Sequence, residues 1–385
     1  MSKKLLSLIT LLTVLGMLAA GCAPTPETQV VKETVVVTQE VEVEKEVTVV
    51  ETVEVEKEVT VVETVEVEKE VPVIETVEVE KEVQVPVVVD PTRPLNIYMV
   101  QHALCAWDAW WCTLQGAVED AEEAFDVDVT ILGPDAFDLE QTAALIDQAV
   151  AAQPDGLAVT VTDPVLFKEP IMRAIEAGIP VVAFNAGSGP EADGIPYLTY
   201  IGMNEYQGGY QGGKRLADAG GNKAVCVNHQ VGHAGLDARC QGLVDAFAEA
   251  GLEAEVLAVT NDPAESQTII DDYYTANPDT DTFLTLGPNS ANPFYAFMDA
   301  AGLGAGDVYH GTFDLSAEIV EKIKDGTTLF GIDQQPYLQG YGSVLTLTLL
   351  DRQGITPALP VTATGPGFVD LSNITIVEAL AGTYR

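Results

Sequence analysis

The hydrophobic positions after residue 92 follow two alternating patterns. Short continuous apolar runs, rich in β-branched residues, predict buried strands at LNIYMVQ (95–101), GLAVTVT (156–162) and IPVVAFN (179–185). Between these runs lie longer segments, such as 109–125 and 139–153, with apolar residues at helical spacing. Because predicted strands and helices alternate, the pattern indicates an α/β fold with a parallel sheet covered by helices on both faces.

The same alternation begins again at KAVCVNH (223–229) and continues to TLFGID (328–333). Two such series of similar size predict two lobes, and ligands of parallel sheets bind beyond the carboxyl ends of the strands. The glycine-rich stretch GGYQGG (208–213) lies inside a helical pattern and lacks the strand-turn-helix order of a dinucleotide site. We interpret its glycines as positions where a helix packs closely against a neighbour.

The N-terminus has a different pattern, typical of a signal peptide over residues 1–21. Lys3 and Lys4 precede an apolar stretch (5–20) that is too short for a spanning helix. The sequence LAAGC, ending at Cys22, resembles the lipobox of bacterial lipoproteins, which implies cleavage before Cys22 and lipidation of that residue. We expect an extracytoplasmic protein held on the cell membrane by its N-terminal lipid; an ordinary signal peptide with an incidental cysteine is the alternative.

An acidic repeat separates this segment from the α/β region. The unit VEVEKEVTVVET begins at Val41, recurs at Val53, and returns with small changes at Val65 and Val77. Val alternates with Glu, as in a strand, but no unit has an apolar face that could form its own core. We interpret residues 22–92 as a spacer kept extended by charge repulsion. A coiled coil or an oligomeric β-rich stalk is the alternative.

Charge and cysteine content narrow the possible partners and the compartment. The formal net charge of −41 argues against nucleic acid or an anionic membrane surface as a binding partner, because like charges repel. Apart from Cys22, the four cysteines suggest two disulfides in an oxidising compartment, and we favour the local pairs Cys105–Cys112 and Cys226–Cys240 among three possible pairings. We expect no metal site, because there is no C-x-x-C and the four histidines are scattered.

Polar side chains follow nearly every predicted strand after residue 93. Asn, Asp and Gln offer hydrogen-bond donors and acceptors without the fixed positive charge of Lys or Arg. All three tryptophans lie in the stretch AWDAWW (106–111), where their faces can contact the apolar C–H face of a sugar. Turn formation is the alternative role for any single Asn or Asp. The candidate residues for binding a neutral, hydroxyl-rich ligand are Gln101, His102, Trp107, Trp110, Trp111, Asn185, Asn261, Asn289, Asp314 and Gln334.

Residues 93–385 resemble a type I periplasmic substrate-binding protein of the ribose and galactose group that serves ABC transporters. The resemblance is carried by IPVVAFNAG, YLTYIGMNEYQGGYQGGKRLA, GLDARCQGLVDAF, HGTFD and GIDQQPYLQGYGSVLTLTLL. It implies two Rossmann-like lobes, joined by three crossing strands, that close on a ligand by hinge motion. By analogy, residues 93–202 and 333–355 form the N-terminal lobe, and residues 203–332 and 356–385 form the C-terminal lobe.

The resemblance also implies roles for particular residues. Trp110 or a neighbouring tryptophan stacks on the sugar, and its hydroxyls are bound by Asn185, Arg239, Asp314 and Gln334. For Arg239, whose five donors can reach two adjacent hydroxyls, a surface ion pair is the competing role.

Two positions depart from the pattern of the family. Asn261 stands where the family often has an aromatic residue, and Asn185-Ala186 stands where a ribose binder would have Asp-Arg. The particular sugar is therefore left open.

No enzyme motif accompanies these features. The chain lacks G-x-S-x-G, H-E-x-x-H and a P-loop, so we expect neither catalysis nor a cofactor. The sequence predicts a lipid-anchored receptor that captures a monosaccharide or similar polyol between two lobes and delivers it to an ABC importer. The alternatives are a nucleoside- or autoinducer-binding lipoprotein, a ligand sensor for a membrane kinase, and a hydrolase.

Overall fold

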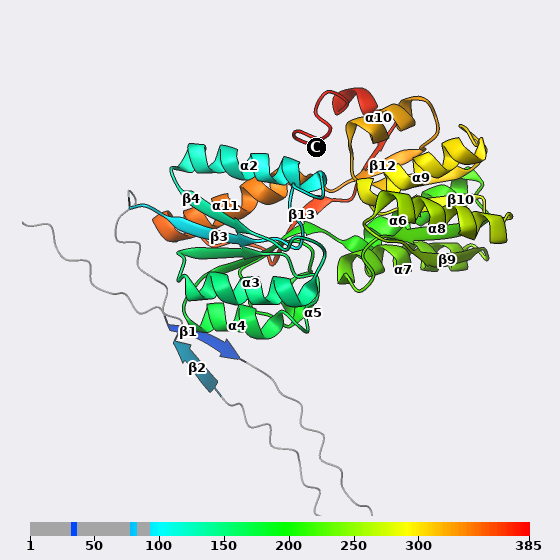
Figure 1. Ribbon diagram of the computed structural model, residues 1–385. Coiled ribbons are helices and arrows are strands. Elements are labelled where there is room, and N and C mark those ends of the chain that lie inside the picture. The colour runs from blue at the N-terminus through cyan, green and yellow to red at the C-terminus, as the bar shows by residue number, and fades with distance from the viewer. Residues whose placement is uncertain (1–31, 37–77, 83–92) are drawn as a thin grey trace, which may run out of the picture. The chain divides into compact units, whose positions relative to one another are not determined.

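The computed structural model describes residues 32–36, 78–82 and 93–385 (Figure 1). In the N-terminal unit, β1 (Lys32–Val36) pairs antiparallel with β2 (Glu78–Glu82), which lies in the fourth acidic repeat. The expected signal peptide, Cys22 and the remainder of the expected spacer lie outside the described residues. No helix in the described part of the chain has both the length and the apolar character needed to cross a bilayer.

The first lobe contains a six-stranded, all-parallel sheet in the order β13-β7-β6-β5-β3-β4. Helices α2 and α11 cover one face, and α3 and α4 cover the other (Figure 1). The elements are β3 (Asn96–Val100), α2 (Trp110–Phe125), β4 (Asp128–Leu132), α3 (Leu139–Ala151), β5 (Gly156–Val159), α4 (Lys168–Glu176), β6 (Val181–Asn185), α5 (Pro190–Asp193), β7 (Tyr200–Met203), α11 (Pro336–Gln353) and β13 (Val361–Gly365).

The second lobe contains a six-stranded sheet in the order β14-β12-β11-β10-β8-β9, parallel except for β14. Helices α6 and α7 pack on one face, and α8, α9 and α10 pack on the other. The elements are α6 (Glu205–Ala219), β8 (Lys223–Asn228), α7 (Ala234–Glu249), β9 (Glu253–Ala258), α8 (Pro263–Ala276), β10 (Thr282–Thr285), α9 (Pro288–Ala301), β11 (Tyr309–Phe313), α10 (Ala317–Lys324), β12 (Phe330–Asp333), β14 (Gly367–Asp370) and the short 3₁₀ helix Ile374–Ile376.

The chain passes between the two sheets three times, after β7, after β12 and between β13 and β14. The alternating strands and helices confirm the predicted α/β architecture of two lobes. One expected boundary differs, because β13 pairs with β7 of the first sheet although the sequence placed residues 356–385 in the second lobe. The third passage therefore follows β13 instead of preceding it.

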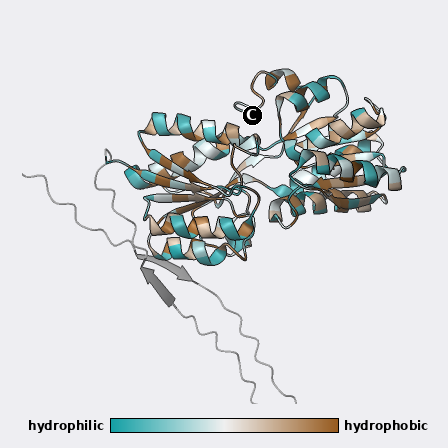
Figure 2. Cartoon of the chain, viewed as in Figure 1, coloured by the Kyte–Doolittle hydropathy of each residue, from teal (hydrophilic) through white to brown (hydrophobic). Residues whose placement is uncertain are grey.

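Apolar side chains fill both faces of each sheet, while polar residues cover the outer surfaces of the helices (Figure 2). All residues of the central strands β5 and β10 are buried, as continuous apolar runs predict for parallel sheets. Side-chain caps fix several helix starts. Asp138 accepts from the backbone N–H of Gln141, and Ser316 accepts from that of Ile319.

The glycine-rich stretch lies on α6 and permits close packing against α7. A Cβ atom added to Gly209 would lie 1.9 Å from the backbone oxygen of Arg239. A Cβ atom added to Gly242 would lie 2.3 Å from the backbone oxygen of Tyr206. The two helix backbones thus meet where each carries a glycine, which fixes the part of α7 that carries Arg239.

Both expected disulfides are present, which confirms the local pairing. Cys105–Cys112 closes the loop that contains the tryptophans, and its cysteines are partly exposed. Cys226–Cys240 is buried and joins β8 to α7. Each bond therefore restrains a segment that leads toward the space between the lobes.

Candidate functional site

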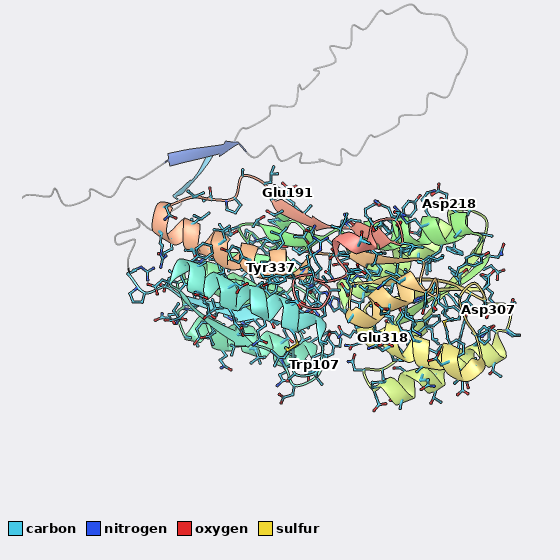
Figure 3. All side chains as sticks on the ribbon, turned by 90° about the horizontal axis from the view of Figure 1, so that it is seen from above. Trp107, Glu191, Asp218, Asp307, Glu318 and Tyr337 are labelled. Atoms are coloured by element: carbon cyan, nitrogen blue, oxygen red, sulfur yellow. A yellow bond between two sulfur atoms is a disulfide. The ribbon has the colours of Figure 1, made fainter. Side chains whose placement is uncertain are left out.

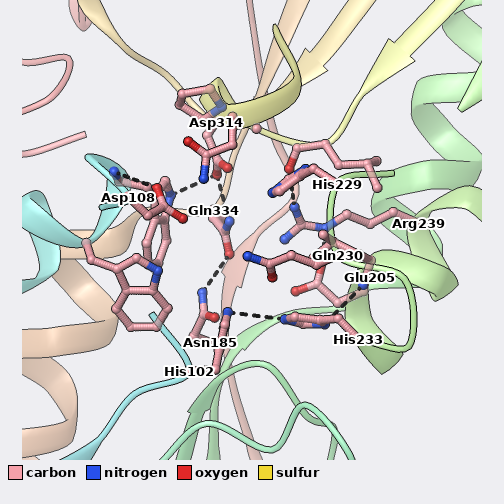
Figure 4. Close-up of a pocket in the computed structure, with 17 residues that line it drawn as sticks. His102, Asp108, Asn185, Glu205, His229, Gln230, His233, Arg239, Asp314 and Gln334 are labelled. Carbon is pink, nitrogen blue, oxygen red and sulfur yellow. Dashed lines mark hydrogen bonds and ion pairs between the residues drawn. The ribbon is translucent and has the colours of Figure 1, made fainter. Parts of the chain in front are cut away.

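A small cavity lies between the lobes, at the carboxyl ends of the strands (Figure 4). Its volume is ≈ 40 Å³, which is room for a few water molecules. A sugar-sized ligand therefore requires the lobes or their side chains to separate. The cavity is lined by His102, Asp108, Trp110, Trp111, Asn185, Glu205, His229, Gln230, His233, Leu236, Arg239, Leu286, Gly287, Pro288, Asn289, Asp314 and Gln334.

Most of the candidate residues from the sequence line this cavity. Four of them belong to the first lobe, three belong to the second lobe, and Gln334 lies in the connection after β12. Parallel strands of both sheets end at this cavity, which explains why strand-end residues far apart in the chain meet here. The candidate residues that line it are His102, Trp110, Trp111, Asn185, Arg239, Asn289, Asp314 and Gln334.

Three candidates do not line the cavity. Gln101 is buried, and its side chain contacts Met99. The indole N–H of Trp107, a residue labelled in Figure 3, donates to the backbone oxygen of Pro134, 3.0 Å away. Asn261 is exposed and follows the edge strand β9, so turn formation explains it better than ligand binding does. The expectation that all three tryptophans contribute to one platform is therefore wrong for Trp107.

The sequence reasoning did not select several residues that line the cavity. Asp108 lies inside the tryptophan stretch, and Glu205 is the first residue of α6 after a passage between lobes. His229 directly follows β8, so its strand-end position was a usable signal. His233 and Gln230 lie in the loop between β8 and α7, for which periodicity gives no signal.

Trp110 connects the two lobes. Its backbone N–H donates to Asp108 Oδ1 at 3.1 Å, and its indole N–H donates to Asp314 Oδ1 at 2.9 Å. The same Asp314 oxygen accepts from the Gln334 side chain at 2.6 Å. Asn185 in turn donates to the side-chain oxygen of Gln334 at 3.3 Å. One hydrogen-bonded network thus runs from the first lobe, through the connection after β12, to the second lobe (Figure 4).

Two strand-end residues of the network have left-handed backbone conformations. Asn185 has φ 60°, and Asp314 has φ 67°. Asn and Asp tolerate this region better than other residues with a Cβ atom, and such conformations concentrate at functional sites. The backbone therefore turns sharply where each of the two side chains meets the cavity.

Arg239 is buried in the site and not at the surface, which removes the surface ion pair as its role. It is 4% exposed, and its Nε donates to Glu205 Oε2 at 2.6 Å. Its Nη1 donates to the backbone oxygen of Leu286 at 3.0 Å, and its guanidinium lies 4.2 Å from the centre of the Phe313 ring. Arg239 is thus held from three sides while its remaining donors border the cavity.

The carboxyl groups in the cavity have raised pKa values because they are buried. Burial raises the pKa of Asp108 to about 6, against the opposing effect of the Trp110 N–H. Burial also raises the pKa of Asp314 to about 7, although the charge of Arg239 acts to lower it. The pKa of Glu205 is raised by burial, with Arg239 again opposing.

Two histidines from opposite lobes meet in the cavity. His233 Nδ1 accepts from the backbone N–H groups of Gly235 and Leu236, at 3.1 and 3.3 Å, so its proton must reside on Nε2. His233 Nε2 lies 3.3 Å from His102 Nε2 and therefore donates to it. The His102 proton then resides on Nδ1, which is buried without a hydrogen-bond partner among the described residues. Protonation of His102 at Nε2 would break this contact, and protonation of His233 at Nδ1 would break its hydrogen bonds with the backbone N–H groups of Gly235 and Leu236.

Burial lowers the pKa of every histidine in the chain. The pKa values of His102, His229 and His310 are lowered to about 3, and that of His233 is lowered well below its usual value. Folding therefore releases protons from four histidines below pH 6.5, while the three buried carboxyl groups of the cavity take protons up.

We expect the free energy of unfolding to fall as the pH falls from 6 to 5. A lowered histidine pKa gives stability that is present above pH 6.5 and lost below it, whereas a raised carboxyl pKa has the opposite sign. The four histidines outnumber the carboxyl groups, so we expect a net loss of stability, measured by urea unfolding. The double variant Asp108→Asn, Asp314→Asn should lose stability more steeply, because two opposing groups are gone. Equal slopes in the two proteins would contradict this assignment.

The described residues contain no group of three or more His, Cys, Asp or Glu side chains arranged to hold a metal ion. The chemistry of the cavity is that of hydrogen bonding, an aromatic surface and buried charge, supplied by both lobes.

Comparison with known proteins identifies the family. Residues 106–351 match the family model of the periplasmic binding protein domain. A xylose/arabinose-binding protein of Sulfolobus acidocaldarius is 28% identical over 273 residues, which are 68% of this chain and 67% of that protein. These relatives are binding and transport proteins, which agrees with the expectation that the chain is not an enzyme.

Comparison with solved structures identifies the same family. A carbohydrate transporter of Acidothermus cellulolyticus, in complex with myo-inositol, is 32% identical, with a TM-score of 0.70, and the match covers 75% of this chain and 99% of the other. A periplasmic sugar-binding protein of an ABC transporter from Legionella pneumophila is 26% identical, with a TM-score of 0.65, over 70% of this chain and 99% of the other. The chain belongs to the periplasmic binding protein family and has its type I fold of two α/β lobes.

Proposed function

We propose that this protein is a receptor that captures a monosaccharide or similar polyol between its lobes and delivers it to an ABC importer. The observation that carries the proposal is the composition of the interlobe cavity. Two indoles of the first lobe face amides, carboxyl groups and a guanidinium, most of which come from the second lobe. An indole face covers the C–H surface of a sugar ring, and the polar groups satisfy its hydroxyls.

The relatives support this class of ligand. The names of two relatives refer to pentose or sugar binding, and the structure with 32% identity holds myo-inositol, a cyclic polyol. A receptor on this fold works by a shift of population. Ligand that contacts both lobes only in the closed state favours closure, and the closed form is the one offered to the importer.

The membrane anchor is part of the proposal, as are the expected lobe boundaries with β13 moved to the first lobe. Cleavage before Cys22 and lipidation there, followed by the spacer 22–92, would hold the receptor at the outer surface of the cell membrane within reach of the importer. Mass spectrometry of the membrane-bound protein tests the lipid, and Cys22→Ala should release the protein into the soluble fraction. Retention of that variant on the membrane would contradict the anchor.

The ligand class is tested by a melting-temperature screen. Pentoses, hexoses and inositols are compared with nucleosides, and hits are followed by calorimetry. A ligand that binds only the native state raises the melting temperature, by an amount equivalent to about 2.7 kcal/mol at a concentration 100 times its Kd. Stabilisation by a sugar or polyol supports the proposal, whereas stabilisation by nucleosides alone would replace it with the nucleoside receptor.

Trp110→Phe should weaken binding of the identified ligand about tenfold. The substitution removes the indole N–H that reaches Asp314 across the cleft, a hydrogen bond to a carboxyl group worth ~1.5 kcal/mol. Trp107→Phe is the matched control, because Trp107 does not line the cavity. Calorimetry of both variants distinguishes the two positions, and equal affinities would show that the indole N–H of Trp110 does not contribute to binding.

A further inference from the structure

The interlobe cavity contains more carboxyl groups than cations. Among the described residues that line it, Arg239 is the one Lys or Arg side chain, and it is already paired with Glu205 at 2.6 Å. Asp108 and Asp314 form no ion pair among the described residues, although they are only 8% and 5% exposed, and Arg239 affects Asp314 only through its charge. The histidines in the cavity are neutral, because burial keeps their pKa values low. Two buried carboxyl groups without a counter-ion are costly, so they indicate a charge that the ligand supplies.

The two carboxyl groups converge from opposite lobes. Asp108 lies in the first lobe just before α2, and Asp314 directly follows β11 in the second lobe. Asp108 Oδ1 accepts from the backbone N–H of Trp110 at 3.1 Å, and Asp314 Oδ1 accepts from the indole N–H of the same residue at 2.9 Å, so both carboxyl groups contact Trp110. Neither Oδ2 atom has a hydrogen-bond partner among the described residues, and both residues line the cavity (Figure 4). The charge of Asp108 also contributes to the raised pKa of Asp314, which shows that the two carboxylates are close enough to repel each other.

The hydroxyl groups of a neutral sugar would satisfy the hydrogen bonding of the two carboxylates but would not balance their charge. A hydroxyl donates one hydrogen bond to a carboxylate but leaves its charge in place. An ammonium group carries three donors and one positive charge, and its hydrogen bonds to carboxylates are about twice as strong as neutral ones. It can bridge two carboxylates and still contact a third acceptor.

Building on the proposed function, we propose that the ligand is an amino-substituted sugar or cyclitol, whose ammonium group binds between Asp108 and Asp314. Closure of the lobes brings the two carboxyl groups to the ammonium from both sides. Trp110 then covers the adjacent ring carbon atoms, and the amides of Asn185 and Gln334 bind the remaining hydroxyls. The positive charge of the ligand therefore stabilises the closed state, because only that state places both carboxylates next to the ammonium.

Matched sets of ligands test the proposal by calorimetry at pH 7.5. Each set contains a neutral parent, its amine and its N-acetyl form, for example glucose, glucosamine and N-acetylglucosamine, or galactose and its two derivatives. Inositol and an aminodeoxyinositol form a further pair. In the set with the matching stereochemistry, the amine should bind at least about tenfold more tightly than its parent. The N-acetyl form, which lacks the charge, should lose this gain.

Two variants locate the effect. Asp108→Asn and Asp314→Asn should each remove most of the preference for the amine, measured as the ratio of the affinities for the amine and its neutral parent in the same variant. Asp299→Asn is the matched control, because it makes the same change of charge on an exposed residue of α9 and should leave the preference intact.

Proton release gives a readout that needs no variant. An ammonium that binds between the two groups stabilises their ionised forms, so amine binding at pH 6.5 should release protons to the buffer. Calorimetry in two buffers with different ionisation enthalpies measures that release.

The outcomes are distinct. Tightest binding by the neutral parent in every set, with no proton release, would overturn the proposal of an amino ligand and leave the receptor function standing. If no sugar, polyol or amine binds, the receptor function fails together with the inference built on it.

Discussion

Gly209→Ala should lower the free energy of unfolding by about 3 kcal/mol, more than other alanine substitutions at helical glycines. The new Cβ atom would lie 1.9 Å from the backbone oxygen of Arg239 and 2.7 Å from its carbonyl carbon. Backbone atoms cannot rotate away as a side chain does, so α6 and α7 must move apart along their contact. The displaced turn of α7 carries Arg239, so ligand affinity should fall together with stability.

Gly116→Ala is the matched control for this substitution. Gly116 lies inside α2, and nothing lies within 4 Å of the position its Cβ would take. Alanine there removes the flexibility of glycine without a clash and should stabilise the protein by about 0.5–1 kcal/mol. Urea unfolding of both variants provides the comparison. A Gly209→Ala protein as stable as Gly116→Ala would show that the two helices separate at no cost.

The role of GGYQGG was predictable from the sequence because a helical pattern and small residues occur in the same stretch. The partner surface was not predictable, since nothing in the stretch indicates that α7 is the helix it meets. Gly242, which faces Tyr206 across the same contact, is an isolated glycine in the middle of α7, and nothing around it in the sequence indicates this packing. Local pattern thus predicts the element and the type of contact, while tertiary structure determines the partner.

The same limit explains the candidates that do not line the cavity. Polar residues follow most of the parallel strands, but the segments after the edge strands β4 and β9 contribute no residue to the cavity. Asn261 follows β9, the last strand of the second sheet, and strand order cannot be read from one sequence. Within the tryptophan stretch, α2 begins at Trp110, so Trp110 and Trp111 lie on the first turn while Trp107 remains in the preceding loop.

Asp108 and Glu205 were missed for a different reason. The candidate residues were predicted mainly from their positions directly after strands, and Asp108 and Glu205 do not directly follow one. The chain also contains 59 acidic residues, so no single one stands out in the sequence. Burial in the cavity distinguishes these two residues from the other acidic residues. That burial depends on the approach of two lobes whose segments are far apart in the sequence. The charge of the site, which separates a neutral from an amino ligand, therefore emerges only in three dimensions.

Arg239→Met should destabilise the protein by about 3–5 kcal/mol at pH 8, the cost of removing one partner of a buried ion pair. Glu205, 7% exposed, would lose its partner at 2.6 Å and keep a buried charge. The backbone oxygen of Leu286 would also lose its donor at 3.0 Å. Methionine retains contact with the Phe313 ring, so the loss reports on charge and hydrogen bonding more than on volume.

The pH dependence of this loss identifies its cause. In the native protein, burial raises the pKa of Glu205 and Arg239 acts to lower it, so removing Arg239 should raise that pKa further. A carboxyl group with a raised folded pKa penalises folding above that pKa and ceases to do so once it is protonated. The defect of Arg239→Met should therefore shrink as the pH falls from 8 to 5. Adding Glu205→Gln to the variant should recover much of the stability at pH 8. A loss below about 1 kcal/mol that does not change with pH would assign the pair the small energy of a surface contact.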